Sequence, residues 1–193
     1  MTDRRAAEIM YPNQEGDWQI ELRQRPIGHR GHAFLALVHN GEIVSELHGF
    51  GHSRHTERRQ MLATDGAHLQ GTESIPDTLR DTKSIGVVKA GGKEEIEKIW
   101  AKGAAAASAI TKGDFDYKAH DPSYELGTDG GQIQNSNSVA YTIAKAMGVE
   151  AAADRVLQEQ DESRRFSGWK RDLLDPKYKR YVAPPVFPVR DAP

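Results

Sequence analysis

The sequence predicts an α+β protein in which an antiparallel sheet of about four to five strands packs against a central helix. Two observations lead to this fold class. Two β-prone runs flank Asn40-Gly41, and an Asn-Gly pair between such runs is the strongest short signal for a hairpin. Further along the chain, an apolar run with helical spacing begins after a cluster of Asn and Ser residues and stops at Gly148.

Most of the strands are expected in the first half of the chain. Residues 17–26 alternate apolar and polar, with Trp18, Ile20 and Leu22 on one face, which is typical of a half-buried strand. This strand would pair with a hairpin of residues 32–38 and 42–48 and form a three-stranded meander. Residues 83–89 and 113–120 contain further short strands. Residues 52–79 show no clear period, so we expect a long surface loop that covers a ligand or is simply disordered.

Three segments have helical spacing. Residues 93–111 carry acidic side chains in their first turns, where they suit the helix dipole, and apolar residues recur on one face. The central helix lies within residues 134–148, and its predicted buried stripe is Val139, Ile143, Ala146 and Met147. A further helix is expected over residues 149–160.

The central helix opens on four polar residues that all favour the N-cap position, namely Asn135, Ser136, Asn137 and Ser138. A buried helix N-terminus gathers free N–H donors and a partial positive charge, which favour an anion or an activated nucleophile. The same cluster would also suit a well-capped core helix without any chemistry. Both interpretations remain open from the sequence.

A histidine in the hairpin supplies the second half of a possible site. His32 follows a glycine at the start of the first hairpin strand. An imidazole at a strand start and a hydroxyl at a buried helix N-terminus can act as base and nucleophile. Ser136 and His32 are therefore our candidate catalytic pair.

The hairpin register decides which side chain could orient His32. With a two-residue turn and no irregularity, Ser45 and Leu47 lie on the face of His32, whereas Glu46 and His48 lie on the opposite face. A bulge of one residue would bring Glu46 or His48 round to His32. His48 is the third candidate catalytic residue on that condition.

Two motifs, G-H-A-F-L-A-L and N-S-N-S-V-A-Y-T-I-A-K-A-M-G, resemble those of the circularly permuted NlpC/P60 group of papain-like hydrolases and acyltransferases. The resemblance covers residues 20–149. It implies a permuted papain-like fold with Ser136 in the nucleophile position and His32 as the base. Asn135, Asn137 and Ser138 would then lie beside the substrate. A Tyr ahead of the helix packs beside it in that group, so Tyr124 would line the site or be an ordinary core residue.

The chain departs from that group at the nucleophile. The group uses Cys there, in the pattern Asn-Cys-x-x-Phe, whereas this chain has Ser136, has Val139 in place of the aromatic residue, and contains no cysteine. Ser136 is a natural replacement, an engineered inactivation or a sign of lost activity. The sequence does not choose among these three.

Length and composition favour one domain with a tail. The 193 residues divide into a flexible N-terminus (1–16), the α+β domain (17–160) and a basic, Pro-rich C-terminal tail (161–193). The basic part of the tail would be a solvated face or a partner-docking surface. The Pro-rich end would lie along the domain as a strap or act as a recognition segment that binds a protein partner.

Several classes of function are disfavoured. The net charge of −2 argues against a nucleic-acid partner, and no apolar run is long enough for a membrane span. The absence of Cys excludes disulfides and thiolate metal sites. No signal peptide is evident, which predicts a cytoplasmic protein or export without a cleaved signal. His48, His52 and His55 have helical spacing, but the glycines among them favour loop histidines, so we expect no metal and no cofactor.

The main hypothesis is therefore a papain-like hydrolase or amidase that acts on a peptide or acyl-amide bond. The alternative is a catalytically silent binding or effector module of a bacterial system on the same fold. A histidine-metal protein is a third, weaker hypothesis.

Overall fold

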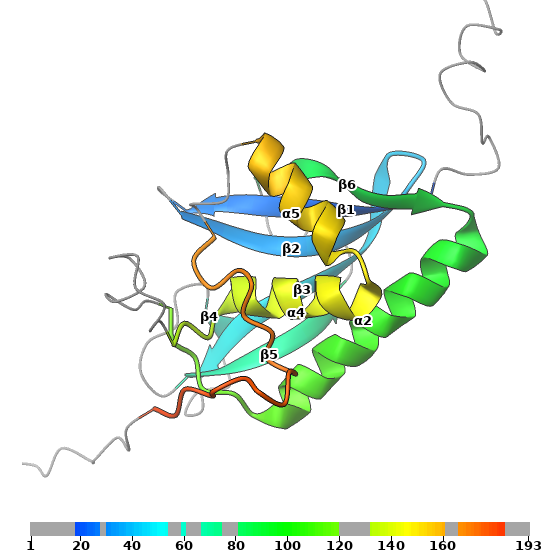
Figure 1. Ribbon diagram of the computed structural model, residues 1–193. Coiled ribbons are helices and arrows are strands. Elements are labelled where there is room, and N and C mark those ends of the chain that lie inside the picture. The colour runs from blue at the N-terminus through cyan, green and yellow to red at the C-terminus, as the bar shows by residue number, and fades with distance from the viewer. Residues whose placement is uncertain are drawn as a thin grey trace, which may run out of the picture.

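The computed structural model describes residues 18–27, 30–53, 59–60, 67–74, 81–119, 132–160 and 166–183. Within these residues the chain forms six strands and three helices (Figure 1). The strands are β1 (Trp18–Ile27), β2 (Arg30–His39), β3 (Glu42–Ser53), β4 (Arg59–Gln60), β5 (Ala67–Ser74) and β6 (Lys83–Gly91). The helices are α2 (Lys93–Gly113), α4 (Ser136–Met147) and α5 (Glu150–Glu159). The predicted α+β class is confirmed.

The strands form one antiparallel sheet in the order β4-β3-β2-β1-β6, with β5 paired to β3. The predicted meander corresponds to β1, β2 and β3. The predicted loop over residues 52–79 is wrong, because this range contains β4 and β5. Only Ala67 and Leu69 of β5 are buried apolar residues. The strand is held by its backbone pairing along β3, which a search for apolar alternation does not detect.

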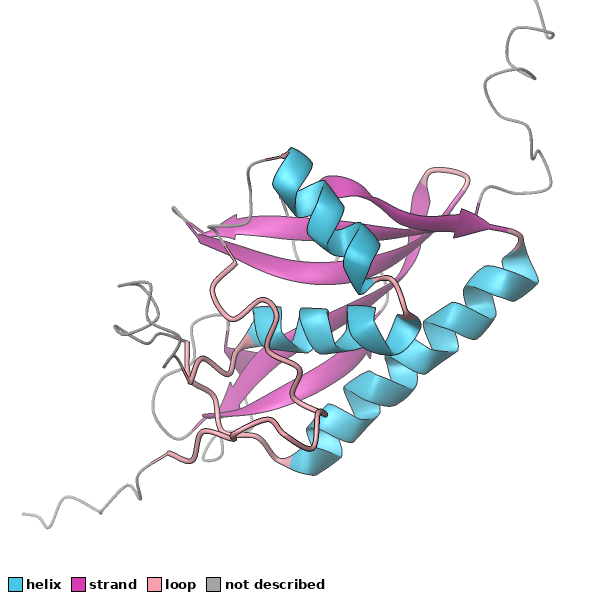
Figure 2. Cartoon of the chain, in the orientation of Figure 1, coloured by secondary structure: helices cyan, strands magenta, loops and turns pink. Residues whose placement is uncertain are grey.

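The helices lie on one side of the sheet (Figure 2). Helix α5 packs on β6, α4 packs on β2 and β3, and α2 runs along β5 and α4. No helix in the described ranges combines the length and apolar character needed to cross a bilayer.

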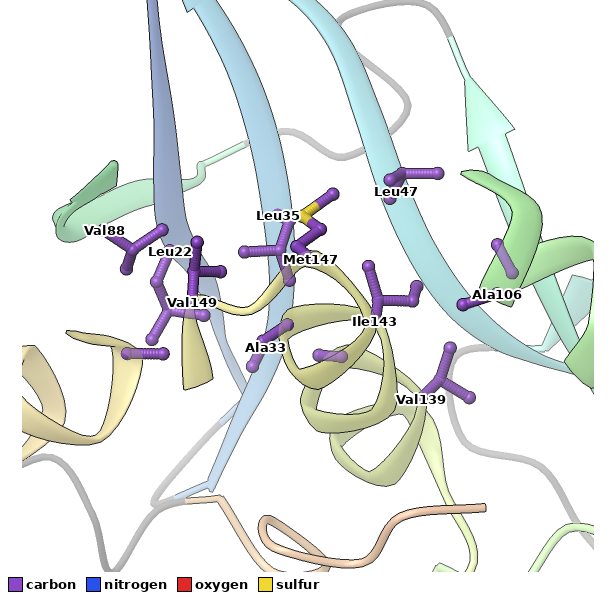
Figure 3. Close-up of a cluster of buried hydrophobic side chains, with 14 of the residues drawn as sticks. Leu22, Ala33, Leu35, Leu47, Val88, Ala106, Val139, Ile143, Met147 and Val149 are labelled. Atoms are coloured by element: carbon purple, nitrogen blue, oxygen red, sulfur yellow. The ribbon is translucent and has the colours of Figure 1, made fainter. Parts of the chain in front are cut away.

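Helix α4 is at the centre of the core (Figure 3). Val139, Ile143 and Met147 are buried against Leu35 and Leu47, as the helical spacing predicts. Burying one such side chain contributes about 1.5–3 kcal/mol. Ala146 is exposed, however, and that part of the prediction is wrong. The buried face of α4 is centred on Ala140, Ile143 and Ala144 because the helix has the sheet on one side and α2 on another.

Strands β2 and β3 separate halfway along their length. They pair from His39 and Glu42 at the turn as far as Leu35 and Leu47, and no further. Beyond that point β2 stays paired with β1, while β3 pairs with β4 and β5. Figure 1 shows the two strands spreading apart behind α4.

Helix α4 approaches the backbone of β3 closely where the strands spread apart. A Cβ atom added at Gly49 would lie 2.4 Å from the Cβ atom of Val139, so only glycine allows this approach. The N-terminal half of α4 is thereby placed directly against the separated strands.

Residues 166–183, which we call the strap, pack along α4 without regular structure. Phe166, Trp169 and Leu173 of the strap are buried in the main core. The Trp169 indole also donates a hydrogen bond of 2.9 Å to Asp154 of α5. Packing onto the domain therefore continues beyond residue 160, and residues 184–193 lie outside the described part of the chain.

Candidate functional site

The N-terminus of α4 is capped by Asn135. Its side-chain oxygen accepts hydrogen bonds from the backbone N–H groups of Asn137 (2.9 Å) and Ser138 (3.2 Å). The Ser138 hydroxyl accepts in turn from the Asn135 N–H at 3.4 Å, which completes a capping box. The short polar side chains predicted at this helix start are there because they satisfy backbone donors that no helical carbonyl can reach.

The same three side chains hold the strap. The amide groups of Asn135 and Asn137 both donate to the Ser167 carbonyl, at 3.0 and 3.1 Å. The Ser138 hydroxyl donates to the Gly168 carbonyl at 3.0 Å. Asn135, Asn137 and Ser138, which the resemblance placed beside a substrate, are therefore engaged with the backbone of the protein itself. We call these three residues the cap cluster.

Ser136 is the first residue of α4 and is 9% exposed. Its side chain is hydrogen-bonded to that of Tyr117. Burial raises the pKa of Tyr117 to about 12, and the bond to Ser136 lowers it by a smaller amount. Tyr117 is held in place because its N–H donates to the Ala67 carbonyl of β5 at 3.0 Å.

Three buried ionisable side chains form a continuous hydrogen-bonded chain on β2 and β3. Nε2 of His32 lies 3.2 Å from Nδ1 of His48, and Nε2 of His48 lies 3.0 Å from Oε2 of Glu46. The exposed fractions of the three residues are 3%, 0% and 1%. We call Glu46, His48 and His32 the relay.

The relay exists because the hairpin contains a bulge. The backbone of Asn40-Gly41 is left-handed at both residues, as a two-residue turn requires. The pairing then shifts, because Val38 pairs with Ile43 but Leu37 pairs with Ser45, leaving Val44 as an extra residue. After this bulge Glu46 pairs with Ala36, so Glu46 and His48 lie on the same face as His32.

Two phenylalanine rings enclose the relay. The ring of Phe34 stacks on His48 with the centroids 4.3 Å apart. The ring of Phe50 stacks on both imidazoles, at 5.2 Å from His32 and 5.1 Å from His48. The relay is therefore in largely apolar surroundings, where electrostatic interactions between its members are strong.

The relay and the cap cluster meet at the start of β2. The N–H of Ala33, next to His32, donates to the side-chain oxygen of Asn137 at 2.9 Å. Ala33 faces the helices, whereas the His32 ring lies with Phe34 on the other face of the strand. The Ser136 hydroxyl is hydrogen-bonded to Tyr117.

The structure thus brings His32 and His48 together. Ser136 precedes Asn137, whose side chain contacts β2. Glu46 was expected here only if the hairpin contained a bulge. Tyr117 was predicted as a strand residue and not as a partner of Ser136, and no local signal distinguishes it. Tyr124 and His55 lie outside the described residues.

Metal ligands do not cluster in the described ranges, where no group of three or more His, Cys, Asp or Glu side chains could hold an ion. His48, one of the three histidines weighed as ligands, is instead a member of the relay.

No protein-family model, curated protein or solved structure matches this chain. The candidate site is accordingly defined by its geometry.

Proposed function

We propose that the protein is a papain-like hydrolase or amidase acting on a peptide or acyl-amide bond, with Ser136 as nucleophile and His32 as base. The observation that supports this proposal is the buried hydrogen-bonded chain from Glu46 through His48 to His32, which begins beside the N-terminus of α4. His48 acts as the residue that orients His32, as the third member of a catalytic triad does.

Acyl transfer at this site follows from the roles of the groups present. His32 takes the proton from the Ser136 hydroxyl as the oxygen attacks the carbonyl carbon, and later returns it to the leaving amine. The N–H groups of Asn137 and Ser138 are already bound to Asn135, so the Ser136 N–H is the donor for the oxyanion. A donor of this kind contributes about 3–4 kcal/mol to the transition state.

The reaction requires the Ser136 hydroxyl to leave Tyr117 and reach His32. The His32 ring lies with Phe34 on the face of β2 away from the helices, so this ring must also turn toward α4. The hydrogen bond that Ser136 loses costs about 1 kcal/mol, and a general base contributes about a hundredfold or more in rate.

Labelling with a fluorophosphonate, which reacts with activated serines, tests this proposal. We expect the wild type to be labelled, Ser136→Ala to be unlabelled, and Ser84→Ala, an exposed serine on β6, to behave like the wild type. Ser136→Cys should hydrolyse peptides and acyl amides faster, because a thiol ionises more readily than a hydroxyl. Absence of labelling in the wild type together with absence of turnover in Ser136→Cys would refute the proposal.

A catalytically silent binding module is the second candidate, and one observation favours it. The polar side chains at the N-terminus of α4 are bound within the protein, including Ser136 to Tyr117. In that case Ser136→Ala should bind peptidoglycan fragments or peptides as the wild type does, measured by calorimetry. A loss of binding in this variant would exclude the silent module.

A further inference from the structure

We infer that the phenol hydroxyl of Tyr117 is a second donor to the oxyanion that forms when Ser136 attacks a carbonyl group. This inference rests on the proposed function and adds a catalytic residue to it. It starts from the backbone donors of α4, where Asn137 and Ser138 give their N–H groups to the Asn135 side chain. That leaves the Ser136 N–H, whereas such a negative charge is ordinarily held by two donors.

The side chains of the cap cluster are already bonded to the protein itself. All three donate to backbone carbonyls of the strap, at Ser167 or Gly168. To bind a substrate oxygen they would have to leave these carbonyls unpaired, which is costly for buried groups. The Tyr117 hydroxyl differs from them, because it is bonded to the Ser136 side chain.

The proposed reaction frees the Tyr117 hydroxyl. The Ser136 oxygen leaves Tyr117 in order to attack, and the buried phenol then needs a new acceptor. The substrate oxygen is bonded to the carbon that Ser136 attacks, so it arrives where the phenol has lost its partner.

Negative charge develops on the substrate oxygen during this step. As the Ser136 oxygen bonds to the carbonyl carbon, the electron pair of the C=O bond moves to the carbonyl oxygen, and the serine proton moves to His32. A hydrogen bond from Tyr117 is therefore stronger in the transition state than in the bound substrate, which is the condition for faster catalysis.

The phenol has a proton to donate at neutral pH. Burial raises the pKa of Tyr117 to about 12, and the bond to Ser136 lowers it by a smaller amount. A neutral phenol can donate to an oxyanion, whereas a phenolate could only accept and would repel it.

Tyr117 is also fixed relative to the start of α4. Its N–H donates to the Ala67 carbonyl of β5 at 3.0 Å. The next residue, Lys118, exchanges two backbone hydrogen bonds of 2.8 and 3.0 Å with Gln134, which lies two residues before Ser136. A donor held in this way does not have to reorganise while the charge develops.

Tyr117→Phe tests the inference, because it removes the hydroxyl and keeps the ring. The matched control is Tyr178→Phe, which loses a hydrogen bond of 3.2 Å from its hydroxyl to the Ile133 carbonyl, close to the same helix start. Both changes are made in the wild type or in Ser136→Cys, whichever background hydrolyses a peptide or acyl amide. We expect kcat to fall by about a hundredfold in Tyr117→Phe with little change in KM, and Tyr178→Phe to match its background.

A second measurement needs no change at Tyr117 and so decides the matter even if Tyr117→Phe fails to fold. A peptide aldehyde adds to the nucleophile of either background and forms a tetrahedral adduct whose oxygen stands in for the oxyanion. With an isotope label on the ring carbon that bears the hydroxyl, adduct formation should shift the NMR signal of Tyr117 and leave that of Tyr178 unchanged.

Two results would overturn the role of Tyr117 and leave the hydrolase standing. One is a folded Tyr117→Phe that reacts as fast as its background, or faster because the hydroxyl only restrained Ser136. The other is an adduct in which the Tyr117 signal does not shift. If neither background reacts with substrate or aldehyde, the hydrolase is refuted and the role of Tyr117 is refuted with it.

Discussion

The relay and the cap cluster are both buried and polar, and they meet at the start of β2, yet their hydrogen bonds are of different kinds. Asn135, Asn137 and Ser138 bond almost entirely to backbone groups of α4, β2 and the strap. The relay is joined by bonds between ionisable side chains, Glu46 to His48 and His48 to His32.

This difference separates a structural role from a chemical one. Side chains that satisfy backbone donors and carbonyls hold elements together, and their removal leaves buried backbone groups unpaired. A buried ionisable chain adds little to net stability because desolvation offsets its attraction, so long as a substitution leaves each remaining polar group with a partner. We therefore expect substitutions in the cap cluster to affect mainly folding, and substitutions in the relay to affect mainly reactivity.

The largest effect is expected at Gly49, where α4 packs closely against β3. Gly49→Ala would place a Cβ atom 2.4 Å from Val139 and force α4 away from β3, at a cost of about 3 kcal/mol in the free energy of unfolding. Urea denaturation measures this cost. The double variant Gly49→Ala/Val139→Ala should recover part of the loss.

Gly92→Ala is the control for that experiment, because a Cβ atom there meets nothing within 4 Å. We expect it to change the stability by less than about 1 kcal/mol. If Gly49→Ala were as stable as Gly92→Ala, the close contact between α4 and β3 would be wrong.

The cap cluster itself is tested at Asn135. Asn135→Ala removes the acceptor of two backbone N–H groups and a donor to Ser167, so we expect a loss of about 2 kcal/mol in denaturation experiments. Asn135→Asp keeps the cap and loses the donor, and should lie between Ala and the wild type. Equal stability of Asn135→Ala and the wild type would contradict a structural role for the cap cluster.

The burial of Tyr117 gives a pH-dependent prediction. The pKa of Tyr117 is raised from 10.0 to about 12, so the folded state holds this proton more tightly than the unfolded state does. The resulting stability is present below pH 10 and is lost as the pH rises through 12, by at most about 3 kcal/mol. Tyr117→Phe should lack this part of the dependence, and an unchanged profile in the variant would refute the assignment.

The smallest effect on stability is expected in the relay. In His32→Gln the side-chain amide can donate or accept, so it can still hydrogen-bond to Nδ1 of His48, and we expect a change of less than about 1 kcal/mol. Labelling by a fluorophosphonate should nevertheless be lost, because no base remains. A variant that unfolds readily but still reacts would reverse the distinction between the two clusters.

Much of the fold was predictable because its signals are local. The Asn40-Gly41 turn, the alternation in β1 and the helical spacing of α2 and α4 each follow from a few neighbouring residues. Strand β5 was missed because its stability comes from pairing with β3 and not from its own pattern. Ala146 was placed wrongly because the packing of α2 and the sheet sets the buried face of α4.

The candidate site was predictable as a set of residues but not as an arrangement. The sequence pointed to His32, His48 and Ser136, and to a bulge as the condition for joining the two histidines. Two contacts could not be predicted, because they join residues far apart in the chain. One is the hydrogen bond between Ser136 and Tyr117, and the other is the set of hydrogen bonds from the cap cluster to the strap.

By itself the sequence determined the hairpin turn, the phases of the main strands and helices, and the capped start of α4, since each depends on the conformational preferences of adjacent residues. Only the tertiary structure decided that Val44 would be the extra residue and that β2 and β3 would separate at Leu35 and Leu47. Strand pairing and helix packing compete for the same backbone N–H groups there. The N–H of Ala33 is hydrogen-bonded to the side chain of Asn137 in α4, which is 104 positions away in the chain.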